Sequence, residues 1–391
     1  MPKKMLAVRK VAREPGLVVD EIPVPVPGDE EVLVEVQAAG ICGTDLHIWK
    51  WDSWSQQRIK TPLTLGHEFS GIVVEAGSKV EHARLGDFVS AESHVTCGMC
   101  YQCRTGQAHL CPRTQILGVD REGAFAEYVC VPEKVIWQND PGKISPEIAA
   151  LQEPFGNAVF ATLNQDITGK SVGILGCGPI GLFSVGIARA SGASHVFASD
   201  LNDIRLALAV EMGADATFNP TAGGDVVSEL VKANEGRGLD VVLEMSGSPI
   251  AINTAFKAAR NGGTVVLFGI PSDPVEIDIA ENMIFKNLQV TALNGRRIFD
   301  TWYKTRWLLA NKVVDLTPLI TRTIGFEEVN ECMPLLAEGN ACKLVLLPSH
   351  RSPAAVEKTE GLSEIDDSST QGTVTHRSRR GRKCTEIWAR P

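Results

Sequence analysis

Hydrophobic residues in the first part of the chain come in short runs. Between Leu17 and about Glu153, such runs occupy residues 32–36, 71–74 and 125–129, and Gly, Pro and Asp separate them. Short apolar runs bounded by these residues are typical of β-strands joined by turns and loops. The pattern therefore predicts a mostly-β first part.

A different rhythm begins at Ser171. An apolar run at 172–175 is followed by a glycine-rich turn, a helical pattern through Ala190 and a second run at 195–199. Further runs at 239–244, 264–268 and 288–292 alternate with helix-like segments. Apolar strands that alternate with helices predict a parallel sheet covered on both faces. We therefore expect an α/β protein whose second domain is a doubly wound parallel sheet.

These patterns divide the chain into four parts. We expect a mostly-β domain at 1–156, a doubly wound domain at 157–297, a return segment at 298–348 that completes the first domain, and a tail at 349–391. The return segment carries a Trp-rich helix pattern at 301–311 and a strand pattern at 343–347. The tail is rich in Ser, Thr and charged residues and poor in apolar ones, so we expect it to be disordered.

Composition narrows the functional classes. The 391 residues carry a net charge of −9, which would repel nucleic acid and anionic membranes at long range. The amino terminus lacks the apolar core of a secretory signal, and Gly and Pro interrupt the charge-free run at 171–188. We expect a cytoplasmic protein that binds neither nucleic acid nor membranes.

Four of the ten cysteines lie within one short stretch, at Cys97, Cys100, Cys103 and Cys111. Their spacing favours a closed tetrahedral zinc site, which has a structural role because it leaves no open position. An iron–sulfur cluster is an alternative, but ferredoxins place three residues before the last cysteine where this chain has seven. Cysteines without a ligand are a further alternative. We expect a structural zinc lobe at about 94–113.

A second set of possible metal ligands lies nearer the amino terminus. Cys42, His67 and Glu68 provide a thiolate, an imidazole and a carboxylate, and glycines flank the first two. A single cysteine or histidine is more often a packing residue, but a catalytic zinc needs about three protein ligands and one open position. Cys42, His67 and either Glu68 or Glu153 meet this requirement.

A glycine motif opens the predicted doubly wound domain. Gly176, Gly178 and Gly181 fit G-x-G-x-x-G between a strand and a helix, and Asp200 follows at the end of the next strand. This arrangement is typical of dinucleotide binding, with the acidic residue on the adenosine ribose. Asp200 would repel the 2′-phosphate of NADP and therefore favours NAD, whereas the nearby Arg205 favours NADP.

Together, residues 40–47, Gly66-His67-Glu68, the four cysteines and the glycine turn resemble the zinc-dependent medium-chain alcohol dehydrogenases. The resemblance covers about residues 5–347 and implies a GroES-like catalytic domain followed by a Rossmann domain. It implies that Cys42, His67 and Glu68 bind a catalytic zinc, with Glu153 beside the metal as an exchangeable ligand or a catalytic helper. It further implies two zinc ions per chain and a homotetramer.

The same resemblance implies further roles. Thr44 and His47 form a proton relay, which their chemistry permits, although Thr44 could instead cap a helix. Residues along NAD are implied to be Ile180, Arg205, Phe268, Gly269, Ile270, Leu293 and Asn294. The pair Leu293-Asn294 departs from the Ile-Tyr usual in the family. Cys177, inside the glycine turn, is interpreted as a small packing residue.

Several longer segments indicate the substrate. Within the family, the chain is most similar to members that oxidise L-threonine to L-2-amino-3-oxobutanoate, through residues 51–55, 94–98, 153–157, 244–247 and 301–304. A polyol such as xylitol or sorbitol is the alternative substrate, and a non-catalytic binding protein on the same fold is a remote one. His94 and Arg297 are candidates for binding the charged groups of an amino acid.

Overall fold

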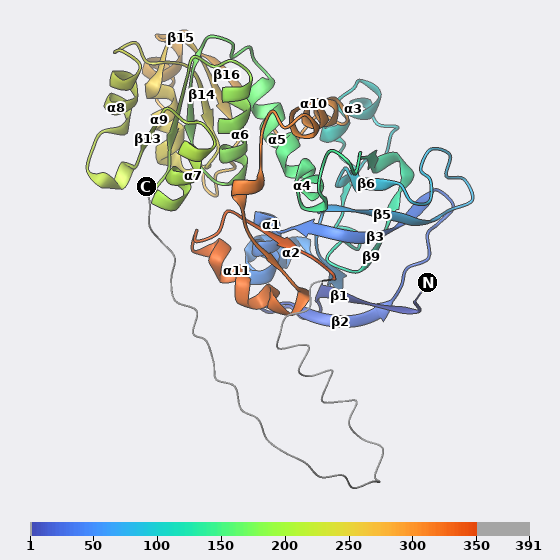
Figure 1. Ribbon diagram of the computed structural model, residues 1–391. Helices are drawn as coiled ribbons and strands as arrows, with labels where there is room; N and C mark the ends of the chain where they lie inside the picture. Colours follow the sequence, from blue (N-terminus) through green and yellow to red (C-terminus); the bar gives the residue numbers. More distant parts are fainter. Residues whose placement is uncertain (1, 350–391) are drawn as a thin grey trace, which may run out of the picture. The chain divides into compact units, whose positions relative to one another are not determined.

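The computed structural model describes residues 2–349 (Figure 1). The tail predicted at 349–391 therefore lies outside the described residues except for Ser349. The described chain is an α/β protein with one parallel sheet and several antiparallel or mixed ones, as the hydrophobic pattern predicts.

The first part of the chain is rich in β-strands. A three-stranded sheet has the order β2-β1-β4, and a larger sheet has the order β10-β6-β5-β3-β18-β17, with β9 also paired to β3. A short hairpin joins β7 and β8. The strands of this part are β1 (Lys4–Lys10), β2 (Val18–Pro23), β3 (Glu31–Gly40), β4 (Leu63–Thr64), β5 (Glu68–Ala76), β6 (Phe88–Ala91), β7 (His94–Val95), β8 (Gln115–Ile116), β9 (Tyr128–Pro132) and β10 (Ile136–Gln138).

One predicted strand is displaced. The apolar run at 125–129 is not a single strand, because β9 begins only at Tyr128. The residues before it bond to β1 instead: the amide of Val8 donates to the carbonyl of Phe125, and Ala7 forms a bridge with Ala126. The run is therefore divided between two sheets, which local alternation cannot reveal.

A six-stranded sheet forms the second part of the chain. Its order is β13-β12-β11-β14-β15-β16 and every neighbouring pair is parallel. The strands are β11 (Ser171–Leu175), β12 (His195–Ser199), β13 (Ala216–Phe218), β14 (Leu239–Glu244), β15 (Ala259–Leu267) and β16 (Gln289–Ala292). Its helices are α6 (Pro179–Ala190), α7 (Asp203–Glu211), α8 (Val226–Ala233) and α9 (Pro249–Ala258), with the π-helical turn η4 at Ala280–Ile284.

Helices cover both faces of this sheet (Figure 1). One hydrophobic cluster joins α6 to the sheet through residues such as Leu182 and Ile174. A separate cluster joins α8 and α9 to the other face through residues such as Leu230, Phe256 and Val242. The sheet is thus doubly wound, in agreement with the prediction.

The chain then returns to its first part. After α10 (Asp300–Ala310), β17 (Ile320–Ile324) and α11 (Val329–Ala337), strand β18 (Lys343–Leu346) pairs antiparallel with β3, and Val345 lies opposite Gly40. The predicted boundary between 156 and 157 falls inside helix α5 (Gln152–Leu163). The domain boundaries themselves stay predictions. The remaining helices are α1 (Gly43–Lys50), α2 (Ser53–Arg58), α3 (Tyr101–Arg104) and α4 (Pro146–Ala150).

The charge-free run at 171–188 forms strand β11 and most of helix α6 rather than a single long helix. Pro179 occupies the first turn of α6, where its missing N–H leaves no bond unmade. Among residues 2–349, no helix is both long and apolar enough to cross a membrane.

Candidate active site

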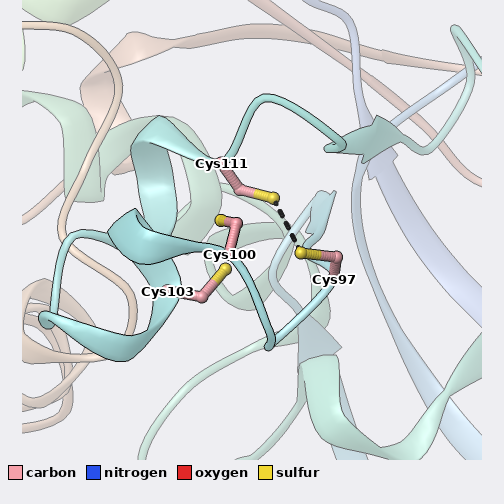
Figure 2. A group of neighbouring side chains, drawn as sticks. All are labelled: Cys97, Cys100, Cys103 and Cys111. Carbon is pink, nitrogen blue, oxygen red and sulfur yellow. Dashed lines mark hydrogen bonds between the residues drawn. The ribbon is translucent and has the colours of Figure 1, made fainter.

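The four cysteines of the predicted structural zinc site converge. Figure 2 shows their side chains pointing toward one another, and all four sulfur atoms lie within 4.8 Å of one another. Cys100 caps the short helix α3 and Cys103 lies inside it, while Cys111 follows the 3-10 turn at Ala108–Leu110. The Sγ atoms of Cys111 and Cys97 are 3.5 Å apart. Four sulfur atoms that converge on one point supply the complete ligand set of a closed tetrahedral metal site.

The surroundings of Cys97 favour its thiolate. The backbone N–H of Met99 lowers the pKa of Cys97 to about 6, whereas desolvation raises the pKa of Cys103 to about 11. The guanidinium of Arg113 also lies against Cys97, with Nη2 3.3 Å from Sγ. A positive charge at this distance offsets part of the negative charge that four thiolates around one zinc would carry.

The second metal-ligand set is assembled by pairing of two strands. Cys42 follows β3 and caps helix α1, whereas Glu68 is the first residue of β5. In the antiparallel register of these strands, Gly40 lies opposite Glu68. One ligand atom from each of Cys42, His67 and Glu68 lies within 4.8 Å of the others. The tertiary structure thus brings together the three ligands that the sequence predicts.

An unpartnered polar atom indicates that this site fits a metal ion. His67 and Glu68 are both buried, and Oε1 of Glu68 has no hydrogen-bond partner in the described chain, whereas Nδ1 of His67 lies 3.9 Å from Oδ1 of the buried Asp45. Buried polar atoms without partners cost folding free energy. A cation bound by Cys42, His67 and Glu68 would offset this cost. The donor set of one thiolate, one imidazole and one carboxylate suits zinc.

Lys343 is a buried residue that the sequence interpretation missed. Its ammonium donates to Oε2 of Glu68 at 2.5 Å and to the carbonyl of Ile41 at 2.8 Å. Burial raises the pKa of Glu68 even with this partner. Lys343 occupies one carboxylate oxygen of Glu68 and leaves the other for a metal.

The predicted relay residues lie on helix α1, directly after Cys42. Oγ1 of Thr44 is 3.8 Å from Sγ of Cys42, and Thr44 lies inside the helix rather than capping it. The His47 side chain is 61% exposed, and its Nδ1 is 2.5 Å from Oδ2 of Asp52. Thr44 is thus near the metal ligands, and His47 is in contact with solvent.

Glu153 lies in a buried network that the sequence did not predict. Its Oε1 accepts a hydrogen bond from Ser93 at 2.6 Å and pairs with Nη2 of Arg296 at 2.7 Å. Arg296 also pairs with Glu92, which in addition accepts a hydrogen bond from the indole of Trp302 at 2.8 Å. The network fixes one oxygen of Glu153 and so orients its carboxylate.

The structure corrects one proposed role of a basic residue. Arg297, a candidate for binding a substrate charge, is exposed and does not line the active-site cavity, whereas its neighbour Arg296 is buried and does. Two adjacent arginines give the sequence no signal for which one turns inward. His94, the other candidate, lines the cavity and contacts Oε1 of Glu92 at 3.0 Å.

The glycine turn has the tight geometry that the motif requires. Gly176 has φ +99°, a conformation open mainly to glycine. A Cβ on Gly181 would lie 1.9 Å from the carbonyl oxygen of Gly176, so only glycine permits this packing of helix on strand. A Cβ on Gly178 would meet nothing within 4 Å, which leaves space for a ligand. Cys177 is fully buried in the core, as expected for a packing residue.

Asp200 lies at the carboxyl end of β12, beside this turn. Its Oδ2 accepts a hydrogen bond from the amide of Cys177 at 2.6 Å, and its Oδ1 accepts one from Asn202 at 2.9 Å. The carboxylate therefore connects the glycine turn to the start of helix α7. This is the strand end where dinucleotide-binding folds place the ribose.

One cavity of about 930 Å³ joins the metal ligands to the glycine turn. Apart from the four structural cysteines and Arg297, only Gly176 and Asp200 among the predicted site residues do not line it. The predicted residues that line it are Cys42, Thr44, His47, His67, Glu68, Glu153, Gly178, Ile180, Gly181, Arg205, Phe268, Gly269, Ile270, Leu293 and Asn294. A metal site and a nucleotide site that share one cavity can act on the same small molecule.

Comparison with known proteins defines the class. Residues 28–141 match the family described as alcohol dehydrogenase GroES-like domain, and residues 179–311 match the family described as zinc-binding dehydrogenase. The chain belongs to the zinc-dependent alcohol dehydrogenase family. It is an oxidoreductase that uses zinc and a nicotinamide cofactor and acts on a small molecule.

Similarity to individual proteins is more specific than the match to these two families. The chain is 48% identical to L-threonine 3-dehydrogenase of Symbiobacterium thermophilum, over 89% of this chain and 99% of the relative. It is 46% identical to L-threonine 3-dehydrogenase of Bacillus velezensis, over 89% of this chain and the full relative. Among solved structures, it resembles a zinc-binding dehydrogenase from Sinorhizobium meliloti bound to NADP, with 34% identity, a TM-score of 0.82 and coverage of 89% of this chain and all of that one.

Proposed function

We propose that the protein oxidises L-threonine to L-2-amino-3-oxobutanoate with NAD as the hydride acceptor. The observation that carries this proposal is the single cavity shared by an open Cys42, His67 and Glu68 metal site and a dinucleotide-binding turn. The threonine specificity is supported by the full-length similarity to L-threonine 3-dehydrogenases.

Cys42, His67 and Glu68 would hold the catalytic zinc, which when bound supplies Lewis-acid chemistry that lowers the pKa of an alcohol. The oxidation removes one proton from the substrate hydroxyl and one hydride from the adjacent carbon. Thr44, on α1 beside Cys42, accepts the hydroxyl proton and passes its own proton toward His47. His47 is exposed and releases the proton to solvent.

Glu153 has a positional role in this proposal. Its carboxylate is fixed by Ser93 and Arg296 at the cavity wall, close to the predicted metal ligands. From this position it can serve as an exchangeable ligand or orient the substrate. Zinc-edge spectroscopy of the Glu153→Gln variant distinguishes these roles, because only a ligand changes the first coordination shell.

The preference for NAD rests on Asp200. A carboxylate at the ribose site repels the 2′-phosphate of NADP, although the solved relative from Sinorhizobium meliloti binds NADP. We expect a higher kcat/KM with NAD than with NADP. In Asp200→Asn, which keeps an acceptor oxygen for the Cys177 amide, we expect this preference to decrease.

The proposed substrate is tested by following formation of NADH with L-threonine, xylitol and sorbitol. Turnover of L-threonine at much higher kcat/KM than either polyol supports the proposal. Efficient turnover of a polyol with none of L-threonine contradicts the substrate and leaves the class intact. Absence of turnover with all three, in protein loaded with zinc, would favour a non-catalytic binding protein.

A homotetramer, a cytoplasmic location and the absence of nucleic-acid and membrane partners also belong to this proposal. The tetramer is implied by the family resemblance, and light scattering after gel filtration measures it directly. A monomer or dimer under assay conditions would contradict this part alone.

A further inference from the structure

Helix α2 contributes two side chains to the active-site cavity, Trp54 and Arg58. They are four residues apart and therefore lie on one face of the helix. Trp54 packs edge-on against His47, with ring centroids 6.2 Å apart. Through this contact, the face of α2 that carries Arg58 lies beside the predicted proton relay.

The cationic side chains that line the cavity in residues 2–349 are few: Arg58, Arg205, Arg296 and Lys343, apart from histidines. Lys343 and Arg296 are buried and already paired with buried carboxylates, Glu68 for the first and Glu92 with Glu153 for the second. Arg205 lies on α7, next to the predicted ribose site. Of these four side chains, only Arg58 lies beside the predicted proton relay and also has N–H donors without a partner.

The hydrogen bonding of Arg58 is incomplete. Its Nη2 donates to Oδ2 of Asp120 at 2.6 Å, and the guanidinium makes no other hydrogen bond in the described chain. A guanidinium has five N–H donors, and a carboxylate can accept two of them in parallel. The Arg58 side chain is 44% exposed and Asp120 is 21% exposed. Asp120 thus holds the guanidinium in place and leaves several donors for a ligand.

We propose that Arg58 binds the α-carboxylate of the amino-acid substrate and thereby selects amino acids over polyols. This inference rests on the proposed function, because it assumes that the substrate is an amino acid. Neutral polyols carry no group that matches a guanidinium. Asp120 is a positioning residue for Arg58, and Trp54, on the same face of α2, packs against His47.

The test compares L-threonine with L-threonine amide in the wild-type protein and in Arg58→Gln. The amide keeps the hydroxyl and the ammonium but loses the negative charge. A charge-assisted hydrogen bond is worth roughly a tenfold change in binding or more. We expect wild type to prefer L-threonine over the amide in kcat/KM by about this factor. In Arg58→Gln, we expect KM for L-threonine to rise by about the same factor, with kcat/KM for the amide unchanged.

Two further variants sharpen the result. Arg58→Lys keeps the charge but not the planar pair of donors, so its KM for L-threonine should lie between those of wild type and Arg58→Gln. Arg237→Gln is a matched control, because Arg237 is exposed, pairs with Glu235 and does not line the cavity. It should have wild-type constants for both substrates.

Three outcomes would overturn the inference. The first is an equal loss with L-threonine and the amide in Arg58→Gln together with a lower melting temperature, since this indicates a structural role. The second is a wild-type KM for L-threonine in Arg58→Gln. The third is equal use of the two substrates by wild type. If wild type oxidises a polyol and no L-threonine, the proposed function itself fails, which is a different result from all three.

Discussion

The ammonium of Lys343 lies 2.5 Å from Oε2 of Glu68, although the two residues are 275 positions apart in the chain. Both side chains are almost completely buried. Lys343 begins β18 and Glu68 begins β5, and both strands pair with β3. The return of the chain after α10 therefore supplies a counter-charge to a predicted zinc ligand.

Substitution of Lys343 by Met should destabilise the metal-free protein. It leaves the buried carboxylate of Glu68 without its ion-pair partner, and loss of one member of a buried pair costs about 3–5 kcal/mol. Urea unfolding of zinc-free protein measures the change in the free energy of unfolding. Lys304→Met is the control, because its partner Asp300 is exposed and such pairs contribute about 1 kcal/mol or less. Equal effects of the two substitutions would contradict this account.

The buried network around Arg296 should make stability depend on acidic pH. Burial by itself would raise the pKa of Glu92, but Arg296 and the hydrogen bonds from His94 and Trp302 outweigh burial and lower this pKa from 4.5 to about 2. A lowered pKa stabilises the fold above the ordinary pKa of 4.5, and this contribution is lost as the pH falls through about 2.

The variant Glu92→Gln lacks this titrating group. Its free energy of unfolding should be well below that of wild type at neutral pH, and the difference should shrink as the pH falls from about 4.5 toward 2. Urea titrations across this range measure it, with the exposed Glu235→Gln as control. A difference that stays constant over the whole range would show that the Glu92 charge does not stabilise the fold.

Zinc content should separate the two metal sites. We expect Cys42→Ser to lose the catalytic zinc and activity, and to keep the ion held by the four clustered cysteines. Cys100→Ser should lose the structural ion and lower the melting temperature. Elemental analysis should give one zinc per chain in each variant against two in wild type. Cys130→Ser is the control, since Cys130 belongs to neither ligand set and should retain both ions.

Two glycines of the cofactor turn should respond differently to alanine. In Gly181→Ala, the added carbon would meet the carbonyl oxygen of Gly176, and such overpacking costs about 1–3 kcal/mol. In Gly178→Ala, the added carbon enters open space at φ −65°, which alanine adopts freely. We expect wild-type stability for this second variant but a higher KM for NAD, because its methyl group blocks the approach of the pyrophosphate. Thermal unfolding and steady-state kinetics measure the two effects, and a stable Gly181→Ala protein would contradict the prediction.

Much of the fold and the site was predictable from local sequence. The parallel sheet follows from apolar runs that alternate with helical segments, and each of its predicted strands is present. The four cysteines and the glycine turn each lie within a short stretch, so their spacing alone restricts their geometry. Cys42, His67 and Glu68 were identified through residue chemistry and family resemblance, and strand pairing then brings them together.

Only the tertiary structure decided which distant residues complete the site. Arg296 pairs with Glu92 across 204 positions, and Arg58 pairs with Asp120 across 62. The division of the run at 125–129 between two sheets also depends on contacts between residues far apart in the chain. Spacing along the chain determines geometry only over a few residues. Which distant charges pair depends on which strands and helices meet. For the buried pair of Arg296 and Glu92, burial also makes the pairing necessary, because an unpaired charge is costly away from water.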